Sequence, residues 1–186
     1  MRIISGNYRG KKIFIPKDKN TRPLRDMVKE SIFNLIEHSK KININIEDSN
    51  ILDLFSGSGS FGLECISRGA NKVTFIENYP LILNILKKNI DLLNAKKSSD
   101  IIESNCFDVL NSEKFSNSKF NIIFVDPPFK EKKINSLLNR IQEMKILQKN
   151  GVLLIHRHKS DDIDLNDNLN IVDQRVYGIS KITIGY

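Results

Sequence analysis

The sequence predicts an α/β fold in which a mostly parallel β-sheet is covered by helices on both faces. Short apolar runs suited to buried strands alternate along the chain with segments whose apolar residues recur at helical spacing. Alternation of this kind demands a parallel sheet with both faces covered. Two strand-like runs, 50–55 and 120–125, lead into a glycine-rich segment and into an acidic, proline-rich segment. Ligands of open α/β sheets bind at such carboxyl ends of strands.

The composition is that of one compact globular protein. Of 186 residues, 40% are apolar and 27% are charged, which suffices for one sizeable core. We expect a cytoplasmic monomer without a membrane partner, because the start is not a signal peptide and no stretch approaches the roughly eighteen apolar residues of a membrane helix. Cys65 and Cys106 lack metal-ligand companions at close spacing, so we expect no metal and interpret both as buried hydrophobes.

Positive charge is concentrated in the first 41 residues. The net charge is +7, and residues 1–41 hold eleven Lys or Arg against four Asp or Glu, so residues 42–186 hold eighteen of each. Arg2 to Ile15, with a turn near Gly6 to Gly10, is predicted to form a β-hairpin before a proline-containing loop. We divide the chain into this basic extension, 1–41, and a main domain, 42–186. The extension is interpreted as a grip on RNA, with candidate contacts Arg2, Arg9, Lys11, Arg22 and Arg25.

A solvated tail is the alternative for the extension. Apolar residues such as Ile3 and Ile13 argue against it, because a disordered tail does not need them. A helix is expected after Asp26, which can cap its amino end. Its apolar face holds Val28, Ile32, Leu35 and Ile36, and its polar face holds Lys29, Glu30, Glu37 and His38. Arg22 and Arg25 at its leading end suit either RNA phosphate or a cofactor carboxylate, and the sequence does not decide.

A cofactor site follows the strand predicted at 50–55. Gly57-Ser58-Gly59-Ser60-Phe61-Gly62 is a G-x-G-x-x-G pattern between this strand and a helical segment, its required context. The glycines permit positive φ and close approach of the backbone to a ligand. Glu77 lies twenty residues past Gly57, at the end of the strand predicted at 72–76, where an acid can bind ribose hydroxyls. To an adenosine-containing cofactor we assign Phe55, Gly57, Ser58, Gly59, Glu77 and Asn78.

Asp53 discriminates between NAD(P) and S-adenosylmethionine, which both fit such a site. A carboxylate just before the glycines repels a pyrophosphate, whereas it attracts the cationic sulfonium and ammonium groups of S-adenosylmethionine. The alternative is that Asp53 only caps the next turn. A weaker pattern, 104–108, follows a short strand at 100–103. There Asp108 is suited to accept a hydrogen bond from the adenine amino group, and the Phe107 amide is suited to donate one to a ring nitrogen.

Asp126-Pro127-Pro128-Phe129, directly after the apolar run 120–125, is the most informative motif. An exocyclic amino group is a poor nucleophile, and it improves when a carboxylate and a carbonyl accept its two hydrogens while an aromatic ring holds the base flat. Asp126, the Pro127 carbonyl and Phe129 supply these functions, and two prolines without an N–H stiffen the turn. The motif predicts methylation of a base amino group. The alternative is an ordinary strand-ending turn.

The remaining segments complete the α/β pattern. Helices are expected over 81–93 and 134–144, a buried strand at 151–155, and a closing hairpin at 170–177 and 181–184. The strand at 151–155 ends in His156-Arg157-His158. We interpret these three residues as solvated. The alternative is that the histidines line the substrate cleft and contact phosphate.

Together, these motifs resemble the RsmD family of 16S ribosomal RNA guanine-N2 methyltransferases, nearly from end to end. Residues 1–12 and 21–34 are similar to the family's signatures, whereas 52–59 and 126–129 recur in many amino-group methyltransferases. The resemblance implies a Rossmann-like S-adenosylmethionine-dependent methyltransferase fold, S-adenosylmethionine as donor, and a guanine of 16S rRNA or of the assembling small subunit as acceptor. This chain departs from the family pattern at Met27, at Phe129, where Tyr is common, and at 156–158, where relatives usually have an acid. Phe129 keeps the stacking face.

Three other functions share some of these features. A DNA adenine or cytosine amino-methyltransferase normally needs a target-recognition domain, for which this chain has no room. An NAD(P) oxidoreductase is disfavoured by Asp53 and by the lack of a recognisable catalytic Tyr-Lys or His-acid arrangement. A non-catalytic RNA-binding protein would need a damaged site, and here the four key positions are intact.

Overall fold

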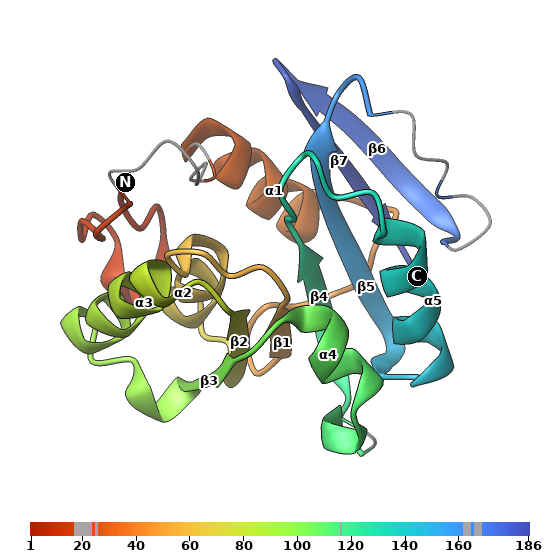
Figure 1. Cartoon of the computed structure of the whole chain (residues 1–186). Coiled ribbons are helices and arrows are strands. Elements are labelled where there is room, and N and C mark those ends of the chain that lie inside the picture. Colours follow the sequence, from red (N-terminus) through yellow and green to blue (C-terminus); the bar gives the residue numbers. More distant parts are fainter. Residues whose placement is uncertain (17–23, 25, 116, 162–164, 166–168) are drawn as a thin grey trace.

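The computed structural model describes residues 1–186 except 17–23, 25, 116, 162–164 and 166–168. A seven-stranded sheet in the order β3-β2-β1-β4-β5-β7-β6 forms its centre (Figure 1). The strands are β1 (Asn50–Asp53), β2 (Lys72–Glu77), β3 (Ser99–Glu103), β4 (Phe120–Val125), β5 (Leu147–His158), β6 (Ile171–Tyr177) and β7 (Ser180–Gly185). Neighbouring strands from β3 to β5 are parallel, and β7 is antiparallel to β5 and β6. The predicted sheet and closing hairpin are confirmed.

Helices cover both faces of this sheet (Figure 1). They are α1 (Asp26–His38), α2 (Ser60–Ser67), α3 (Pro80–Leu92), α4 (Cys106–Asn111) and α5 (Ile134–Glu143), with 3₁₀ helices η1 (Gly6–Tyr8), η2 (Lys96–Ser98) and η3 (Glu113–Phe115). Ile122 and Phe124 of β4 join the core under α1, α2 and α3, whereas Ile123 and Val125 join the core under α4 and α5. Both faces of the central strands are therefore apolar, as strand alternation requires. No helix in the described part of the chain is long and apolar enough to cross a membrane.

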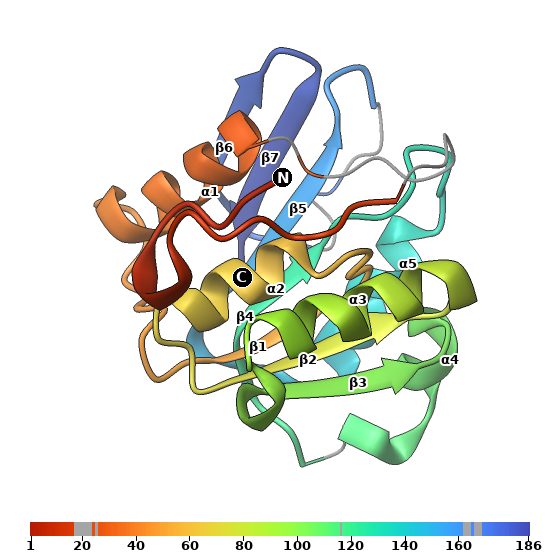
Figure 2. The same cartoon turned by 90° about the vertical axis from the view of Figure 1, so that its left-hand side faces the viewer.

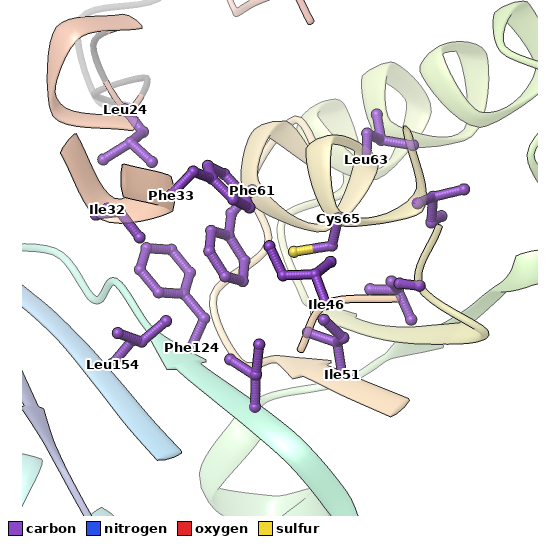
Figure 3. Packing of buried hydrophobic residues seen from close by; sticks show 14 of the residues in the cluster. Leu24, Ile32, Phe33, Ile46, Ile51, Phe61, Leu63, Cys65, Phe124 and Leu154 are labelled. Atoms are coloured by element: carbon purple, nitrogen blue, oxygen red, sulfur yellow. The ribbon is translucent and has the colours of Figure 1, made fainter. Parts of the chain in front are cut away.

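An aromatic stack connects α1, α2 and β4 (Figure 3). The Phe61 ring lies 4.0 Å from the Phe124 ring and 5.3 Å from the Phe33 ring, measured between centroids, and both pairs are stacked. Such pairs contribute about 0.5–1.5 kcal/mol each beyond the area that they bury. Phe124 lies two residues before Asp126, so the stack fixes the strand that carries the Asp-Pro-Pro-Phe motif.

The amino-terminal hairpin is a short antiparallel ladder rather than a pair of regular strands. The N–H of Ile3 donates to Lys11 O, that of Gly10 to Ile3 O, and that of Ile13 to Met1 O. One isolated bridge joins Arg2 to Lys12, and the turn contains η1. The ladder lies beside α1 and α2 (Figure 2), and Ile3 and Ile13 belong to the core under α1, α2 and α3. The alternative of a solvated tail is therefore wrong for this described segment.

Lys29 corrects the expected polar face of α1. Its side chain is fully buried, with Nζ 3.3 Å from Oε2 of Glu64 and 2.7 Å from the carbonyl oxygen of Arg2. The carboxylate of Glu64, on α2, also accepts the N–H groups of Ile4 and Ser5, at 2.8 Å each. Helical spacing assigned Lys29 to solvent, but the amino-terminal segment covers that side of α1. The buried pair attaches this segment to both helices.

Candidate active site

The candidate residues meet at one edge of the sheet. Asp53 and Glu77 end β1 and β2, and Asp126 directly follows β4. β1 pairs in parallel with both β2 and β4, and Asp53 is in register with Phe124. The strand order reverses between β1 and β4, which is where doubly wound sheets open a crevice for ligands. The glycine turn and the Asp-Pro-Pro-Phe motif therefore flank the same crevice.

The turn between β1 and α2 has the shape expected from its glycines. Gly57 and Gly59 have φ values of +55° and +83°, which side chains disfavour. A Cβ would lie 2.5 Å from the Leu86 side chain if added to Gly59, and 2.3 Å from the Phe75 ring if added to Gly62. Packing therefore requires glycine at both positions. A Cβ on Gly57 would meet nothing within 4 Å, so Gly57 leaves open space that a ligand can use.

Asp53 is a buried carboxylate with one unsatisfied oxygen. The residue is 1% exposed, its Oδ2 accepts a 3.2 Å hydrogen bond from the Gly62 N–H, and its Oδ1 has no partner among the described residues. Burial above all, then the nearby Asp126 carboxylate and less strongly Glu77, raise the pKa of Asp53 to about 8, against the effect of the Gly62 bond. One oxygen thus caps α2, and the other would be stabilised by a cationic or donor ligand.

Glu77 holds the glycine turn from the neighbouring strand. Its Oε2 accepts from the Gly57 N–H at 2.9 Å, and its Oε1 accepts from the N–H groups of Asn78 and Tyr79 at 2.9 and 2.8 Å. A shallow, solvent-open pocket of about 40 Å³ lies beside it, lined by Leu54, Phe55, Ile76, Glu77, Asn78, Ser104, Asn105 and Cys106. The predicted cofactor residues Phe55, Glu77 and Asn78 are therefore brought together. In the described chain, no group of three or more His, Cys, Asp or Glu is arranged to hold a metal ion.

Phe107 and Asp108 lie in the first turn of α4. The Phe107 N–H donates to Oδ1 of Asn105 at 2.9 Å, which caps α4, so this amide is not directed at a ligand. The Phe107 ring makes an edge contact with Phe55 at 6.4 Å between centroids. Asp108 is exposed. The sequence pattern assigned this amide to adenine because it did not predict α4. In the structure the amide is part of the amino-terminal cap of that helix.

Asp126 contacts the end of β5. Its Oδ1 lies 2.8 Å from Nδ1 of His156, and its side chain keeps 18% exposure. The Phe129 ring lies edge-on to His156 and His158, at 5.8 and 5.2 Å between centroids. Pro127 is buried, and no described group donates to its carbonyl oxygen. The motif and the histidines thus form one cluster at the carboxyl ends of β4 and β5.

The interpretation of 156–158 as solvated is wrong for His156 and Arg157, whereas His158 is half-buried. His156 and Arg157 are 7% and 4% exposed, because β7 pairs with β5 as far as His158 and the 128–131 loop covers Arg157. The Arg157 guanidinium donates to the carbonyl oxygens of Pro128 and Phe129 at 3.0 Å and of Glu131 at 2.9 Å, and it pairs with Asp161. Val125 pairs with Ile155, so neighbouring β4 and β5 place Asp126 beside His156. No local sequence signal gives this register.

The basic candidates of the amino-terminal ladder remain on the surface. Arg2, Arg9 and Lys11 are exposed, and Lys11 Nζ lies 5.1 Å from the centre of the Tyr8 ring. Arg22 and Arg25 lie outside the described residues. Among the described residues, Arg2, Arg9 and Lys11 make no hydrogen bond or ion pair with the glycine turn or with Asp126.

Asn89 on α3 is a site-supporting residue that sequence reasoning missed. It is fully buried, its Oδ1 accepts from the Phe14 N–H at 2.8 Å, and its Nδ2 donates to the carbonyl oxygens of Phe14 and Ser58, both at 2.9 Å. The amino-terminal segment and the glycine turn are thus joined through one amide side chain. Nothing local marks Asn89, because both of its partners are distant in sequence.

Comparison with known proteins agrees with this architecture. The model of a family described as "Conserved hypothetical protein 95" matches residues 1–186. The putative rRNA methyltransferase YlbH of Bacillus subtilis is 30% identical over 99% of this chain and 97% of its own. The ribosomal RNA small subunit methyltransferase D of Haemophilus influenzae is 31% identical over 96% and 90%. The solved structure of the putative methyltransferase yhhF from Escherichia coli superposes with a TM-score of 0.83 at 28% identity, over 100% of this chain and 96% of that one. The chain therefore belongs to this family, the RsmD family that its motifs resemble, and has the Rossmann-like fold of a methyltransferase.

Proposed function

We propose that this protein transfers a methyl group from S-adenosylmethionine to the exocyclic N2 of a guanine in 16S rRNA of the small ribosomal subunit. The observation that carries the proposal is the reversal of strand order between β1 and β4. At this edge of the sheet the buried Asp53, whose Oδ1 has no partner among the described residues, lies near the Asp126 carboxylate. Adjacent carboxylates in a buried site favour a cationic ligand and disfavour a pyrophosphate. The names of the Bacillus and Haemophilus relatives support rRNA as the substrate class.

The residues present fit this cofactor. The open side of Gly57 admits the cofactor to the backbone, and Glu77 is placed to exchange its bond with the Gly57 N–H for bonds to ribose hydroxyls. Phe55 and Asn78 line the adjoining pocket, which we assign to adenine, and we assign Asp108 of α4 to the adenine amino group. Asp53 Oδ1, which has no partner among the described residues, would interact with the positive groups of the donor. When bound, the sulfonium supplies an electrophilic methyl carbon.

The Asp-Pro-Pro-Phe motif acts on the other substrate. Asp126 and the Pro127 carbonyl accept the two hydrogens of the amino group, Pro128 keeps the turn stiff, and the Phe129 ring holds the base. With S-adenosylmethionine bound, the nitrogen lone pair would form the new N–C bond as the C–S bond releases its electron pair to sulfur. One proton leaves the nitrogen, and the Asp126 carboxylate is placed to accept it. Alignment of the reacting atoms supplies most of the acceleration. We assign RNA binding to the extension 1–41, with exposed Arg2, Arg9 and Lys11 contacting phosphates.

The test is methylation in vitro, followed by identification of the methylated nucleotide and of its position in the RNA. Small-subunit RNA from cells lacking this protein, free or in assembling particles, is incubated with the enzyme and methyl-labelled donor, and is then digested to nucleosides. We expect label in N2-methylguanosine at one position. Label in adenine or cytosine, or transfer to DNA rather than RNA, would refute the proposal.

A further inference from the structure

The end of β5 touches the substrate motif at two separate points. His156 reaches the Asp126 carboxylate through Nδ1, at 2.8 Å. Arg157, the next residue, reaches the backbone after Pro127 through three N–H···O bonds to Pro128, Phe129 and Glu131. Successive strand residues point to opposite faces, so the two side chains approach the loop from different sides. Both are more than nine-tenths buried.

These contacts occupy some of the hydrogen-bond acceptors of the Asp-Pro-Pro-Phe motif and leave others open. His156 occupies Oδ1 of Asp126 and leaves Oδ2 without a donor among the described residues. Arg157 occupies the carbonyls of Pro128 and Phe129, and Pro128 O accepts in addition from the Glu131 N–H at 2.8 Å. The Pro127 carbonyl lacks a donor in the described chain. Two acceptors therefore remain, one from Asp126 and one from Pro127, which is the number that a primary amino group needs.

The protonation of the His156 ring follows from its partner. An ionised Asp126 can only accept, so Nδ1 must carry the proton. Nε2 has no partner among the described residues although it is buried, whether the ring is neutral or charged. An unsatisfied buried polar atom costs about 1–3 kcal/mol. Packing alone does not explain why a buried histidine should bear this cost. Donation of Nδ1–H to the Asp126 carboxylate does explain it.

We propose that His156 and Arg157 are positioning residues of the methyl-transfer site: His156 orients the Asp126 carboxylate and Arg157 fixes the loop backbone, so that Asp126 Oδ2 and the Pro127 carbonyl together receive the target amino group. This rests on the proposed function for the identity of the substrate. The arrangement of the two side chains exists without substrate.

The first experiment examines the arrangement without enzyme activity. The chain has three histidines, so long-range nitrogen–proton NMR can assign each ring. We expect His156 to carry its proton on Nδ1, and Asp126→Ala to abolish that preference while His38, on the exposed end of α1, stays unchanged. A His156 protonated on Nε2 alone in the wild-type protein would overturn the proposal.

The second experiment compares two amides at position 156. His156→Asn places an N–H near the position of Nδ1, whereas His156→Gln places it near Nε2. With wild-type enzyme on small-subunit RNA as reference, we expect Asn to keep most of kcat and Gln to lose roughly ten- to a hundredfold, by misplacement of a reacting group. The cofactor Kd should not change in either. Equal kcat values for the two variants would overturn the role of His156. His38→Asn and His38→Gln are the matched controls.

The third experiment replaces the planar fork of Arg157 by a single ammonium. Arg157→Lys keeps the charge beside Asp161 but cannot reach three carbonyls at once. We expect kcat to fall roughly tenfold or more with unchanged cofactor Kd. Arg140→Lys is the control, because Arg140 also donates to a carbonyl, that of Leu110, but lies on α5. A kcat for Arg157→Lys equal to that of the control would overturn the role of Arg157. If wild-type enzyme methylates no RNA, the proposed function fails, and the NMR result still decides whether His156 holds Asp126.

Discussion

At the scale of single residues, the buried Asp53 lowers the free energy of unfolding of the cofactor-free protein. Its burial and the neighbouring Asp126 raise its pKa to about 8, whereas an unfolded chain ionises it near the ordinary value of about 3.9. The folded state therefore binds a proton more tightly than the unfolded state, and the free energy of unfolding falls as pH rises from about 4 to about 8. A cationic cofactor relieves this cost.

We predict that Asp53→Asn stabilises the cofactor-free protein while it removes cofactor binding. The amide keeps an acceptor for the Gly62 N–H and needs no ionisation, so the gain should be near zero at pH 4 and should grow to on the order of a few kcal/mol by pH 8. Thermal unfolding across this pH range measures it, and calorimetry measures binding of S-adenosylmethionine. A variant that is less stable than wild type at pH 8, or that binds the donor as well, would contradict the role of Asp53.

Asp126 differs from Asp53, because it is partly exposed and its proposed role is with the second substrate. We predict that Asp126→Ala lowers kcat at least about a hundredfold, by analogy with the loss of one electrostatic partner at other reacting centres. The cofactor Kd should stay close to the wild-type value. Single-turnover methylation and calorimetry measure the two quantities. Near-normal turnover would show that Asp126 does not hold the amino group.

Local sequence revealed the residues that follow strands, but not their partners. Gly57, Asp53 and Asp126 are recognisable because turn chemistry and strand ends are local features. Arg157 and Lys29 were assigned to solvent, since strand and helix periodicity do not show which distant segment covers a position. His156 became interpretable only when the register of β4 and β5 was known.

At the scale of elements, the amino-terminal segment is held by a buried ion pair. Burial lowers the pKa of Lys29, and the Glu64 carboxylate opposes that shift. Both side chains are inaccessible to solvent, and Glu64 also satisfies two backbone N–H groups. Removal of one partner from such a pair leaves an uncompensated buried charge.

We predict that Glu64→Gln costs about 3–5 kcal/mol in the free energy of unfolding. Glu143→Gln, in the exposed pair with Arg140, is the matched control and should cost about 1 kcal/mol or less. Urea unfolding compares the two variants. Similar costs for both would mean that the buried pair does not fix the amino-terminal segment.

The same segment carries the proposed RNA contacts on its exposed side. We predict that replacing Arg9 and Lys11 by Glu weakens RNA binding and reduces the salt slope of log K by roughly one for each phosphate that is no longer neutralised. Lys114→Glu with Lys149→Glu makes the same change in net charge at exposed positions before β4 and near the start of β5, outside the amino-terminal segment. Filter binding at several salt concentrations separates the two. An equal change in RNA affinity and salt slope for the two double variants would show a general effect of net charge instead of a local RNA-binding surface.

At the scale of the whole molecule, the alternation of strands and helices was sufficient to predict the sheet, its layers and the edge at which ligands bind. The amino-terminal segment was harder. Its buried residues Ile3 and Ile13 join the core under α1, α2 and α3, and its ladder depends on contacts to α2 and α3 that no local pattern contains. The crevice is therefore built from segments that only the complete fold brings together.

A crystal structure of the protein with S-adenosylhomocysteine, the demethylated product of the proposed donor, tests the central claim most directly. The account predicts the adenosine in the pocket lined by Phe55 and Asn78, the ribose hydroxyls on Glu77, and the sulfur between the Gly57 turn and Asp126. Product bound at another edge of the sheet, or a sulfur directed away from Asp126, would contradict it.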